Sequence, residues 1–194
     1  MLIVGIDASA VEMDLMAGRL ACSMCGPGLR PWGYGVDREV RLRVGIERRR
    51  LRRSICRACG ATHVLVPEDM LLRRRDAVEV VGVALTAKAG GKGHRRIAAD
   101  LGRPPSTVRG WLRRFAVMAG ALREHFTRWA YALDPVHDRL SLGGSGLFDA
   151  VEAVGVFAIV AVRRFGPRPA WSLACVVTGG GLLCNTSSLW AQPV

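Results

Sequence analysis

The sequence predicts a mainly α-helical protein that contains a small β zinc ribbon, a trihelical helix-turn-helix domain and apolar C-terminal helices. Three observations predict this fold class. Two C-x-x-C-G pairs flank a segment with strand periodicity, a helix–glycine–helix pattern follows, and the last third of the chain holds a long apolar stretch. Half of the 194 residues are hydrophobic, so the chain has enough apolar side chains for a buried core.

Residues 1–20 are predicted to form a short strand over 2–6 and then a helix. Ser9 is the expected N-cap of this helix, and Glu12 three residues later completes a capping box. The start of the chain lacks a basic region, a long apolar run and a small-residue cleavage site. It is therefore not typical of a secretory signal, and a cytoplasmic location is expected.

Residues 21–66 are predicted to form the zinc ribbon. Two C-x-x-C pairs stand thirty residues apart, and each offers two thiolates from one tight loop, so that together they supply the tetrahedral set that Zn²⁺ prefers. A glycine directly follows each pair, where a positive φ lets backbone N–H groups point at sulfur. The predicted Zn²⁺ ligands are Cys22, Cys25, Cys56 and Cys59.

One nearby histidine and two further cysteines are not predicted to bind the metal. His63, four residues after Cys59, could replace a thiolate, but four cysteines already complete a tetrahedron. A surface position, or one beside the ligands, is therefore favoured for His63. Cys175 and Cys184 lie in an apolar tail and are expected to be buried free thiols.

The segment between the cysteine pairs is predicted to be a β-hairpin. Apolar residues at 40, 42, 44 and 46 alternate with Arg41, Arg43 and Gly45, which is the period of a half-buried strand. The segment is dense in arginine, which predicts contacts with phosphate groups; a charged edge that prevents strand pairing between molecules is the alternative. The arginines of this segment that we expect to contact nucleic acid are Arg41, Arg43, Arg49 and Arg50.

Residues 68–132 are predicted to be helical and to hold a helix-turn-helix over 94–115. Ile97, Ala98 and Leu101 give the first helix an apolar face, and Gly102 is expected to end it in the left-handed conformation. Ser106 is the expected N-cap of the second helix, whose apolar residues recur at 108, 111, 112 and 115. These intervals are typical of a helix-turn-helix, and an ordinary helical hairpin with a charged outer face is the alternative.

A preceding helix over 76–89, which ends at Gly90-Gly91, is expected to complete the trihelical core. In a helix-turn-helix the N-terminal residues of the second helix read base edges in the major groove. Arg109 is the best candidate for a bidentate contact with guanine, and Thr107 is expected near a thymine methyl or a phosphate. The predicted DNA-binding set of this region is Arg95, Arg96, Arg103, Ser106, Thr107, Arg109, Gly110, Arg113 and Arg114.

The net charge supports a polyanionic partner. The chain carries +12, and 26 of its 28 basic residues are arginine, partly a codon bias. From Arg19 to Arg114 there are 22 basic and 8 acidic residues, net +14, whereas the other 98 residues have 6 basic and 8 acidic, net −2. A positive field confined to one region of the chain indicates nucleic acid.

Residues 134–194 are predicted to contain a glycine-rich linker at 143–146, an apolar helix at about 147–165 and a shorter helix at about 169–178. The stretch from 169 to 194 is uncharged and as long as a membrane span, but glycines at 179–181 and polar residues at 185–188 interrupt it. A buried helix and loop are therefore favoured over a membrane anchor. The two helices are expected to pack on the preceding domain or to form a homodimer contact.

Residues 20–130 resemble an uncharacterised bacterial family that joins a zinc ribbon to a helix-turn-helix, and also the N-terminal DNA-binding regions of insertion-sequence transposases. The resemblance depends on CSMCG, CRACG, the following ATHVLVP, and GHRRIAADLGRPPSTVRGWLRRF. It implies binding to double-stranded DNA, at transposon ends in the case of the transposases.

No catalytic constellation is evident, so we predict that the protein is not an enzyme. A transposase core needs three carboxylates on a large mixed sheet, and the acids after residue 133 lie in a short helical segment. Asp7 follows a strand as a nuclease metal ligand would, but the ribbon begins too soon for such a sheet.

The predicted function is sequence-specific, zinc-stabilised binding of double-stranded DNA, by a transcriptional regulator or a transposon-associated factor. The alternatives are a non-catalytic remnant or accessory subunit of a transposase, a membrane-anchored regulator, and a ribbon that binds RNA or protein.

Overall fold

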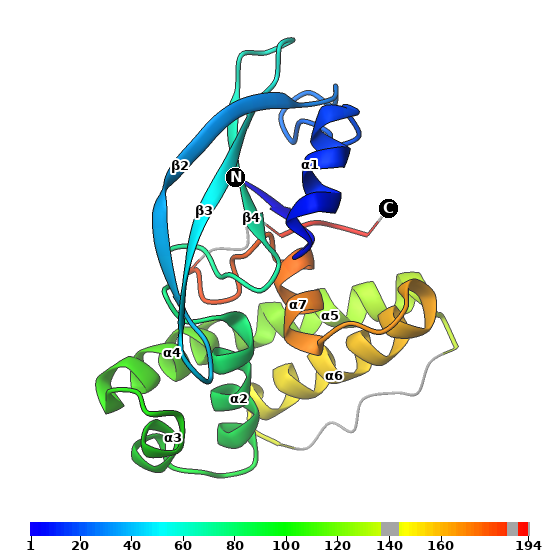
Figure 1. Ribbon diagram of the computed structural model, residues 1–194. Helices are drawn as coiled ribbons and strands as arrows, with labels where there is room; N and C mark the ends of the chain where they lie inside the picture. The colour runs from blue at the N-terminus through cyan, green and yellow to red at the C-terminus, as the bar shows by residue number, and fades with distance from the viewer. Residues whose placement is uncertain (137–143, 186–189, 194) are drawn as a thin grey trace.

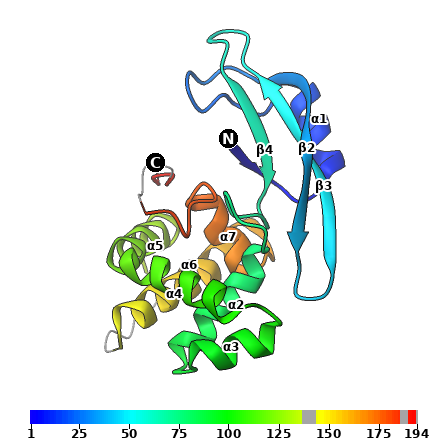
Figure 2. The same ribbon diagram turned by 90° about the vertical axis from the view of Figure 1, so that its left-hand side faces the viewer.

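A four-stranded sheet lies along one side of a group of helices in the computed structural model, which describes residues 1–136, 144–185 and 190–193 (Figures 1 and 2). Within these residues there are seven helices and four strands, so the fold is mainly α with a small β part, as predicted. The strands are β1 (Leu2–Val4), β2 (Arg30–Arg41), β3 (Ile46–Ile55) and β4 (Thr62–Pro67). The helices are α1 (Ala8–Met16), α2 (Val78–Ala89), α3 (His94–Leu101), α4 (Pro105–Val117), α5 (Ala119–Leu133), α6 (Gly146–Phe165) and α7 (Ala170–Val177).

The sheet has the strand order β1-β4-β3-β2 and joins the first 20 residues to the predicted ribbon. β1 is parallel to β4, with Leu2 opposite Leu65, whereas β3 is antiparallel to both β4 and β2. Consecutive residues of β4 point into two different hydrophobic cores. Leu65 packs with Val4 beside α1, and Val66 belongs to the core of the helices. One strand therefore connects the two cores.

The hairpin turns earlier than the sequence pattern indicates. β2 ends at Arg41, the Leu42 N–H donates to the Gly45 carbonyl at 3.1 Å, and Gly45 has a φ of +86°. The predicted strand through residues 40–46 is therefore wrong: Val40 is buried, but Val44 and Ile46 are 87% and 61% exposed. The apolar alternation continues across a turn whose position is set by the glycine, because only glycine adopts a positive φ without strain.

The predicted capping box of α1 is also wrong. Asp7 is the N-cap, and its Oδ1 accepts hydrogen bonds from the N–H groups of Ser9 at 2.9 Å and Ala10 at 3.2 Å. Aspartate is among the strongest N-caps and comes two residues before Ser9, so the helix begins earlier. The Glu12 carboxylate instead forms an ion pair with Arg52 of β3 at 2.8 Å.

The helical bounds after residue 77 agree closely with the sequence, although residues 68–77 form a loop and not a helix. α2 ends at Gly90, and Gly102 ends α3 with φ +60° and ψ +40°, as predicted. Ser106 is not the N-cap of α4, because the helix begins at Pro105 after Pro104. A proline at the first helical position already has a helical φ and needs no N–H partner.

α6 and α7 pack on the preceding helices, which is the first of the two roles expected for them. α6 lies along α5, where the rings of Phe126 and Phe157 are 5.5 Å apart, and α7 lies against α2, where Trp171 contacts Gly82. Part of the predicted linker, residue 143, falls outside the described residues, and Ser145 caps α6. No helix in the described part of the chain is long and apolar enough to cross a bilayer.

Candidate metal centre and nucleic-acid interface

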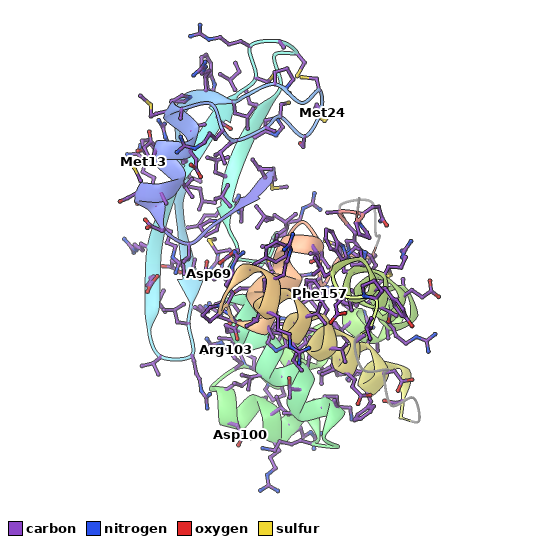
Figure 3. The ribbon with its side chains drawn as sticks, turned by 90° about the vertical axis from the view of Figure 1, so that its right-hand side faces the viewer. Met13, Met24, Asp69, Asp100, Arg103 and Phe157 are labelled. Carbon is purple, nitrogen blue, oxygen red and sulfur yellow. The ribbon has the colours of Figure 1, made fainter. Side chains whose placement is uncertain are left out.

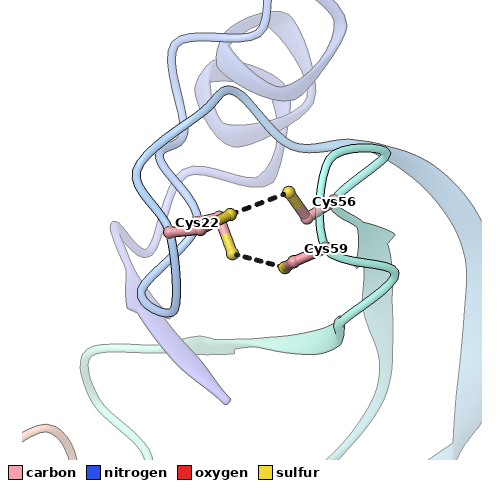
Figure 4. A group of neighbouring side chains, drawn as sticks. Cys22, Cys56 and Cys59 are labelled. Carbon is pink, nitrogen blue, oxygen red and sulfur yellow. Dashed lines mark hydrogen bonds between the residues drawn. The ribbon is translucent and has the colours of Figure 1, made fainter.

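The four predicted ligands converge beside α1, at the end of the sheet that is farthest from α2–α7, between the loop before β2 and the β3–β4 loop (Figures 1 and 4). The Sγ atoms of Cys22 and Cys59 are 3.8 Å apart, those of Cys25 and Cys56 are 3.5 Å apart, and all four lie within 4.8 Å of one another. A disulfide requires about 2 Å, and all four cysteines are free.

These distances fit a four-thiolate metal site. Four sulfurs bound to Zn²⁺ at about 2.3 Å in a tetrahedron lie about 3.8 Å from one another. Each loop supplies one buried cysteine, Cys22 or Cys56, and one exposed cysteine, Cys25 or Cys59. The residues present could therefore hold a metal ion between the two loops.

The two loops share one geometry, in which glycine has the positive φ predicted for it, although its own N–H points at a carbonyl oxygen and not at sulfur. The N–H of Gly26 donates to the Cys22 carbonyl and that of Gly60 to the Cys56 carbonyl, both at 2.9 Å. Their φ values are +94° and +72°, which an L side chain rarely adopts. Each glycine thus closes the turn that carries a pair of thiols.

The backbone around the buried thiols favours the thiolate form. Burial opposes ionisation of Cys22, but hydrogen bonds from the backbone of Met24, at 3.4 Å, and of Cys25 lower its pKa overall. The backbone N–H of Cys59 lowers the pKa of Cys56 to about 7, whereas hydrogen bonding with Cys59 and Cys56 raises the pKa of Cys25. A thiolate is the form that binds metal.

His63 lies beside the cysteines and not on the surface. Its side chain is buried in β4, and its Nε2 is 3.4 Å from the Sγ of Cys22. Of the two positions considered for His63, the one beside the ligands is therefore correct. Partners outside a metal's own ligand set commonly orient its ligands, and His63 is placed to do so for Cys22.

The residues predicted to contact DNA lie on α4 and around it. Val108, Trp111 and Phe115 are buried, so the helix presents Ser106, Arg109 and Arg113 to solvent, with Thr107 and Gly110 half-buried at the side. Arg109 and Arg113 form no ion pair or hydrogen bond through their side chains within the described residues. Their guanidinium groups are available for an external anion.

Two of the predicted phosphate contacts are occupied inside the protein. Arg103 donates from Nε to Asp76 at 2.5 Å and from Nη2 to the Leu42 carbonyl at 2.8 Å, and its side chain is only 13% exposed. Arg49 donates from Nη1 to both carboxylate oxygens of Asp69 at 2.7 Å. Arg103 and Asp69 lie between the strands and the helices in Figure 3. We therefore assign both arginines to holding the hairpin in place.

The other predicted arginines lie on the hairpin, on α3 and on α4. Arg43 is exposed at the hairpin turn, which the Arg103–Leu42 contact fixes beside the α3–α4 connection. Arg95 and Arg96 are exposed on α3. The remaining three make contacts within the protein. The backbone N–H of Arg41 donates to the Arg75 carbonyl, and the Arg50 guanidinium lies over the Tyr34 ring. Arg114 donates to the Gly110 carbonyl.

Two features of this surface are not predicted from the sequence. Arg73–Arg75 lie in the 68–132 segment that is predicted to be helical, but they form part of the loop between β4 and α2. Trp32 and Tyr34 are 53% and 52% exposed on the edge strand β2. The triple arginine and the aromatic pair are both visible in the sequence, but their exposure depends on the tertiary fold.

Comparisons with protein-family models, with curated proteins and with solved structures give no match for this chain.

Proposed function

We propose that the protein binds double-stranded DNA in a sequence-specific way, with α3 and α4 acting as a helix-turn-helix and α4 as its recognition helix. The observation that carries this proposal is the exposed face of α4, where Ser106, Arg109 and Arg113 stand opposite a fully buried apolar stripe. A rigid helix with unpaired arginines on its outer face suits the major groove, where arginine pairs bidentately with guanine.

The hairpin supports the same proposal from a neighbouring element. The hydrogen bond between Arg103 and the Leu42 carbonyl fixes the hairpin turn beside the start of α4, so Arg43 lies on the same side as the α3–α4 connection. Phosphate contacts at the turn would position α4 without specifying a sequence. The net charge of +14 over residues 19–114 supplies the long-range attraction.

We infer that the four-cysteine cluster holds a structural Zn²⁺. The hydrophobic core around it is small, with Val4, Leu15, Leu29 and Leu65 beside two of the cysteines. A core of this size gains much of its stability from a metal. Four thiolates close the coordination sphere and leave no position for a substrate, which suits a structural role.

Metal content tests this part of the proposal. Purified protein is expected to contain about one zinc per chain by mass spectrometry, as a closed four-cysteine site does. Cys56→Ser is expected to abolish retention, and Cys184→Ser, which changes a thiol outside the cluster, is expected to retain it. Retention of zinc by Cys56→Ser would contradict the assignment.

Binding to duplex DNA and to structured RNA at matched salt tests the nucleic-acid part. Duplex DNA is expected to bind more tightly, with an affinity that falls linearly on a log–log scale as salt rises.

A second candidate is single-stranded nucleic acid, because Tyr34 is exposed and Arg52 lies over its ring at 4.6 Å. Exposed aromatic rings next to arginine are a common stacking platform, and a preference for single strands would favour that candidate.

The biological role follows from the target. We propose a transcriptional regulator or a transposon-associated factor; a neighbouring gene that encodes a nuclease core would favour the second, including a non-catalytic transposase subunit. Helix-turn-helix proteins commonly bind paired half-sites as dimers, so two copies per site are expected. Sedimentation of the complex on a selected duplex measures that number.

A further inference from the structure

The arginine run Arg73–Arg75 lies in a loop that is fixed on both sides. The Leu72 N–H donates to the Gly180 carbonyl at 3.0 Å, and the Arg41 N–H donates to the Arg75 carbonyl at 2.6 Å. The loop is therefore held between the hairpin and the turn after α7. Its side chains project from a constrained backbone, which lowers the entropy lost when they bind a ligand.

Arg73 has a strained backbone. Its φ is +59°, and no other non-glycine residue in the described part of the chain has a positive φ. A side chain in this conformation costs about 1 kcal/mol or more, and such strain is concentrated at binding and catalytic sites. Glycine would remove the strain, but an arginine occupies the position.

Arg74 is a partly buried cation without a counter-charge. Its Nε is buried and has no hydrogen-bond partner among the described residues. Burial lowers the pKa of its guanidinium, and the nearby charge of Arg114, from α4, lowers it further. A buried cation beside a like charge is unfavourable unless an anion completes the site.

Two hollows meet at this loop. One, of about 370 Å³, is lined by Arg73, Arg74 and Arg114, and no carboxylate of the described residues lines it. The other, of about 680 Å³, is lined by all three arginines of the run together with Arg38 and Arg48 of the hairpin, and by Asp37 and Glu39. Because the hollows share Arg73 and Arg74, this loop contributes arginines both to the hollow that reaches α4 and to the hollow that reaches the hairpin.

We propose that Arg74, with Arg73 and Arg114, forms a phosphate-binding site that takes a backbone phosphate of the nucleic acid contacted by α4. This assignment rests on the proposed function. A phosphate offers several acceptor oxygens, so one group can accept from the guanidinium groups of Arg74 and Arg114, which line the same hollow. It would also supply the negative charge that the described residues do not supply to the smaller hollow.

The same chemistry could be satisfied by free phosphate, so the experiment has two arms. In the first, duplex affinity is measured over a salt series for the wild type, for Arg74→Gln and for Arg164→Gln, an exposed arginine at the end of α6. Arg74→Gln is expected to weaken binding roughly tenfold on every sequence and to reduce the salt slope by about one, and Arg164→Gln is expected to leave the slope unchanged.

In the second arm, the Nε–H signal of Arg74 is followed by NMR while inorganic phosphate or duplex is added. The site is supported if the Arg74 signal shifts when duplex is added and if Arg74→Gln reduces the salt slope of duplex binding. A response to inorganic phosphate with an unchanged duplex slope in Arg74→Gln would overturn the backbone assignment in favour of free phosphate, and no response to either would overturn the site.

The outcomes separate this inference from the proposed function. If the wild type binds duplex and Arg74→Gln binds it with the same affinity and slope, the inference fails alone. If the wild type binds no duplex, the proposed function fails and the backbone assignment fails with it. Because Arg74 Nε has no partner, Arg74→Gln is expected to keep the wild-type melting temperature, and Arg114→Gln provides a second variant if it does not fold.

Discussion

At the scale of single residues, spacing in the sequence predicts local chemistry well and long-range pairing poorly. The four cysteines were predictable because each pair lies within one turn, and their glycines reveal the turn. The role of Arg103 was not, because its partners Asp76 and Leu42 are 27 and 61 residues away. The sequence therefore predicts a phosphate contact for Arg103, whereas in the fold its guanidinium group connects the hairpin to the helices.

We predict that Arg103→Gln destabilises the protein by about 3 kcal/mol, because it leaves the buried Asp76 carboxylate without its cation. Arg95→Gln, which changes an exposed arginine of α3, is expected to stay within about 0.5 kcal/mol of the wild type. Urea denaturation measures both. The double variant Arg103→Gln/Asp76→Asn is expected to lose less than the sum of the single changes, and strict additivity would contradict the assigned pair.

At the scale of elements, the ends of the helices could be predicted from apolar periodicity and from glycine. The N-caps and the strand ends could not, because neighbouring residues offer more than one possible start or end. Gly102 ends α3 because its left-handed conformation is needed there. Asp7 displaced Ser9, and Pro105 displaced Ser106, because stronger start signals stood one or two residues earlier. The hairpin turn was missed because the apolar alternation of residues 40–46 continues through it.

Glycines within two helices are predicted to respond in opposite directions to alanine. A Cβ on Gly82 of α2 would lie 2.1 Å from a ring atom of Trp171, so Gly82→Ala is expected to cost about 1–3 kcal/mol by forcing α7 away. Gly155 of α6 has open space at the same position, so Gly155→Ala is expected to stabilise by about 0.5–1 kcal/mol. Thermal unfolding compares the two, and a stabilised Gly82→Ala would contradict the close packing of α2 on α7.

The contact between α5 and α7 is predicted to be sensitive to acid. His125 is fully buried, its Nε2 is 3.0 Å from the Val177 carbonyl, and burial lowers its pKa despite that hydrogen bond. The unfolded chain therefore takes up a proton below about pH 6.5, where the folded ring stays neutral, and stability falls as pH decreases from there. This group contributes at most about 1.4 kcal/mol per pH unit.

His125→Gln keeps an N–H donor for the Val177 carbonyl but cannot titrate. The loss of unfolding free energy between pH 7.5 and pH 5.5 is expected to be smaller in this variant than in the wild type. Denaturant unfolding at the two pH values measures it, and an equal loss in both proteins would exclude His125 as the cause.

At the scale of the whole molecule, two cores meet along β4. The larger core contains side chains of α2 to α7, and the smaller one lies beside α1 and the cysteines. The sequence predicted each part but not the way in which β1, β4 and the 68–77 loop join them, because those contacts connect segments far apart in the chain. The interface that we propose lies where the two parts meet.

Removal of the metal is therefore predicted to affect the two parts unequally. Chelation is expected to raise hydrogen exchange strongly around residues 20–29 and 56–61, which carry the ligands, and far less in α2, α4 and α6, whose core is separate. Exchange mass spectrometry with and without chelator measures this pattern. A uniform rise over the whole chain would show that the helices also depend on the metal.

Selection of duplexes from a random library, with zinc measured on the same samples, tests the central claim most directly. The wild type is expected to contain about one zinc per chain and to enrich a defined sequence, whereas Arg109→Ala is expected to keep the zinc and lose preference at one guanine-bearing position. Arg164→Gln, a matched loss of charge on α6, is expected to enrich the wild-type sequence. Enrichment of no sequence by the wild type, or of the same sequence by Arg109→Ala, would contradict sequence reading by α4.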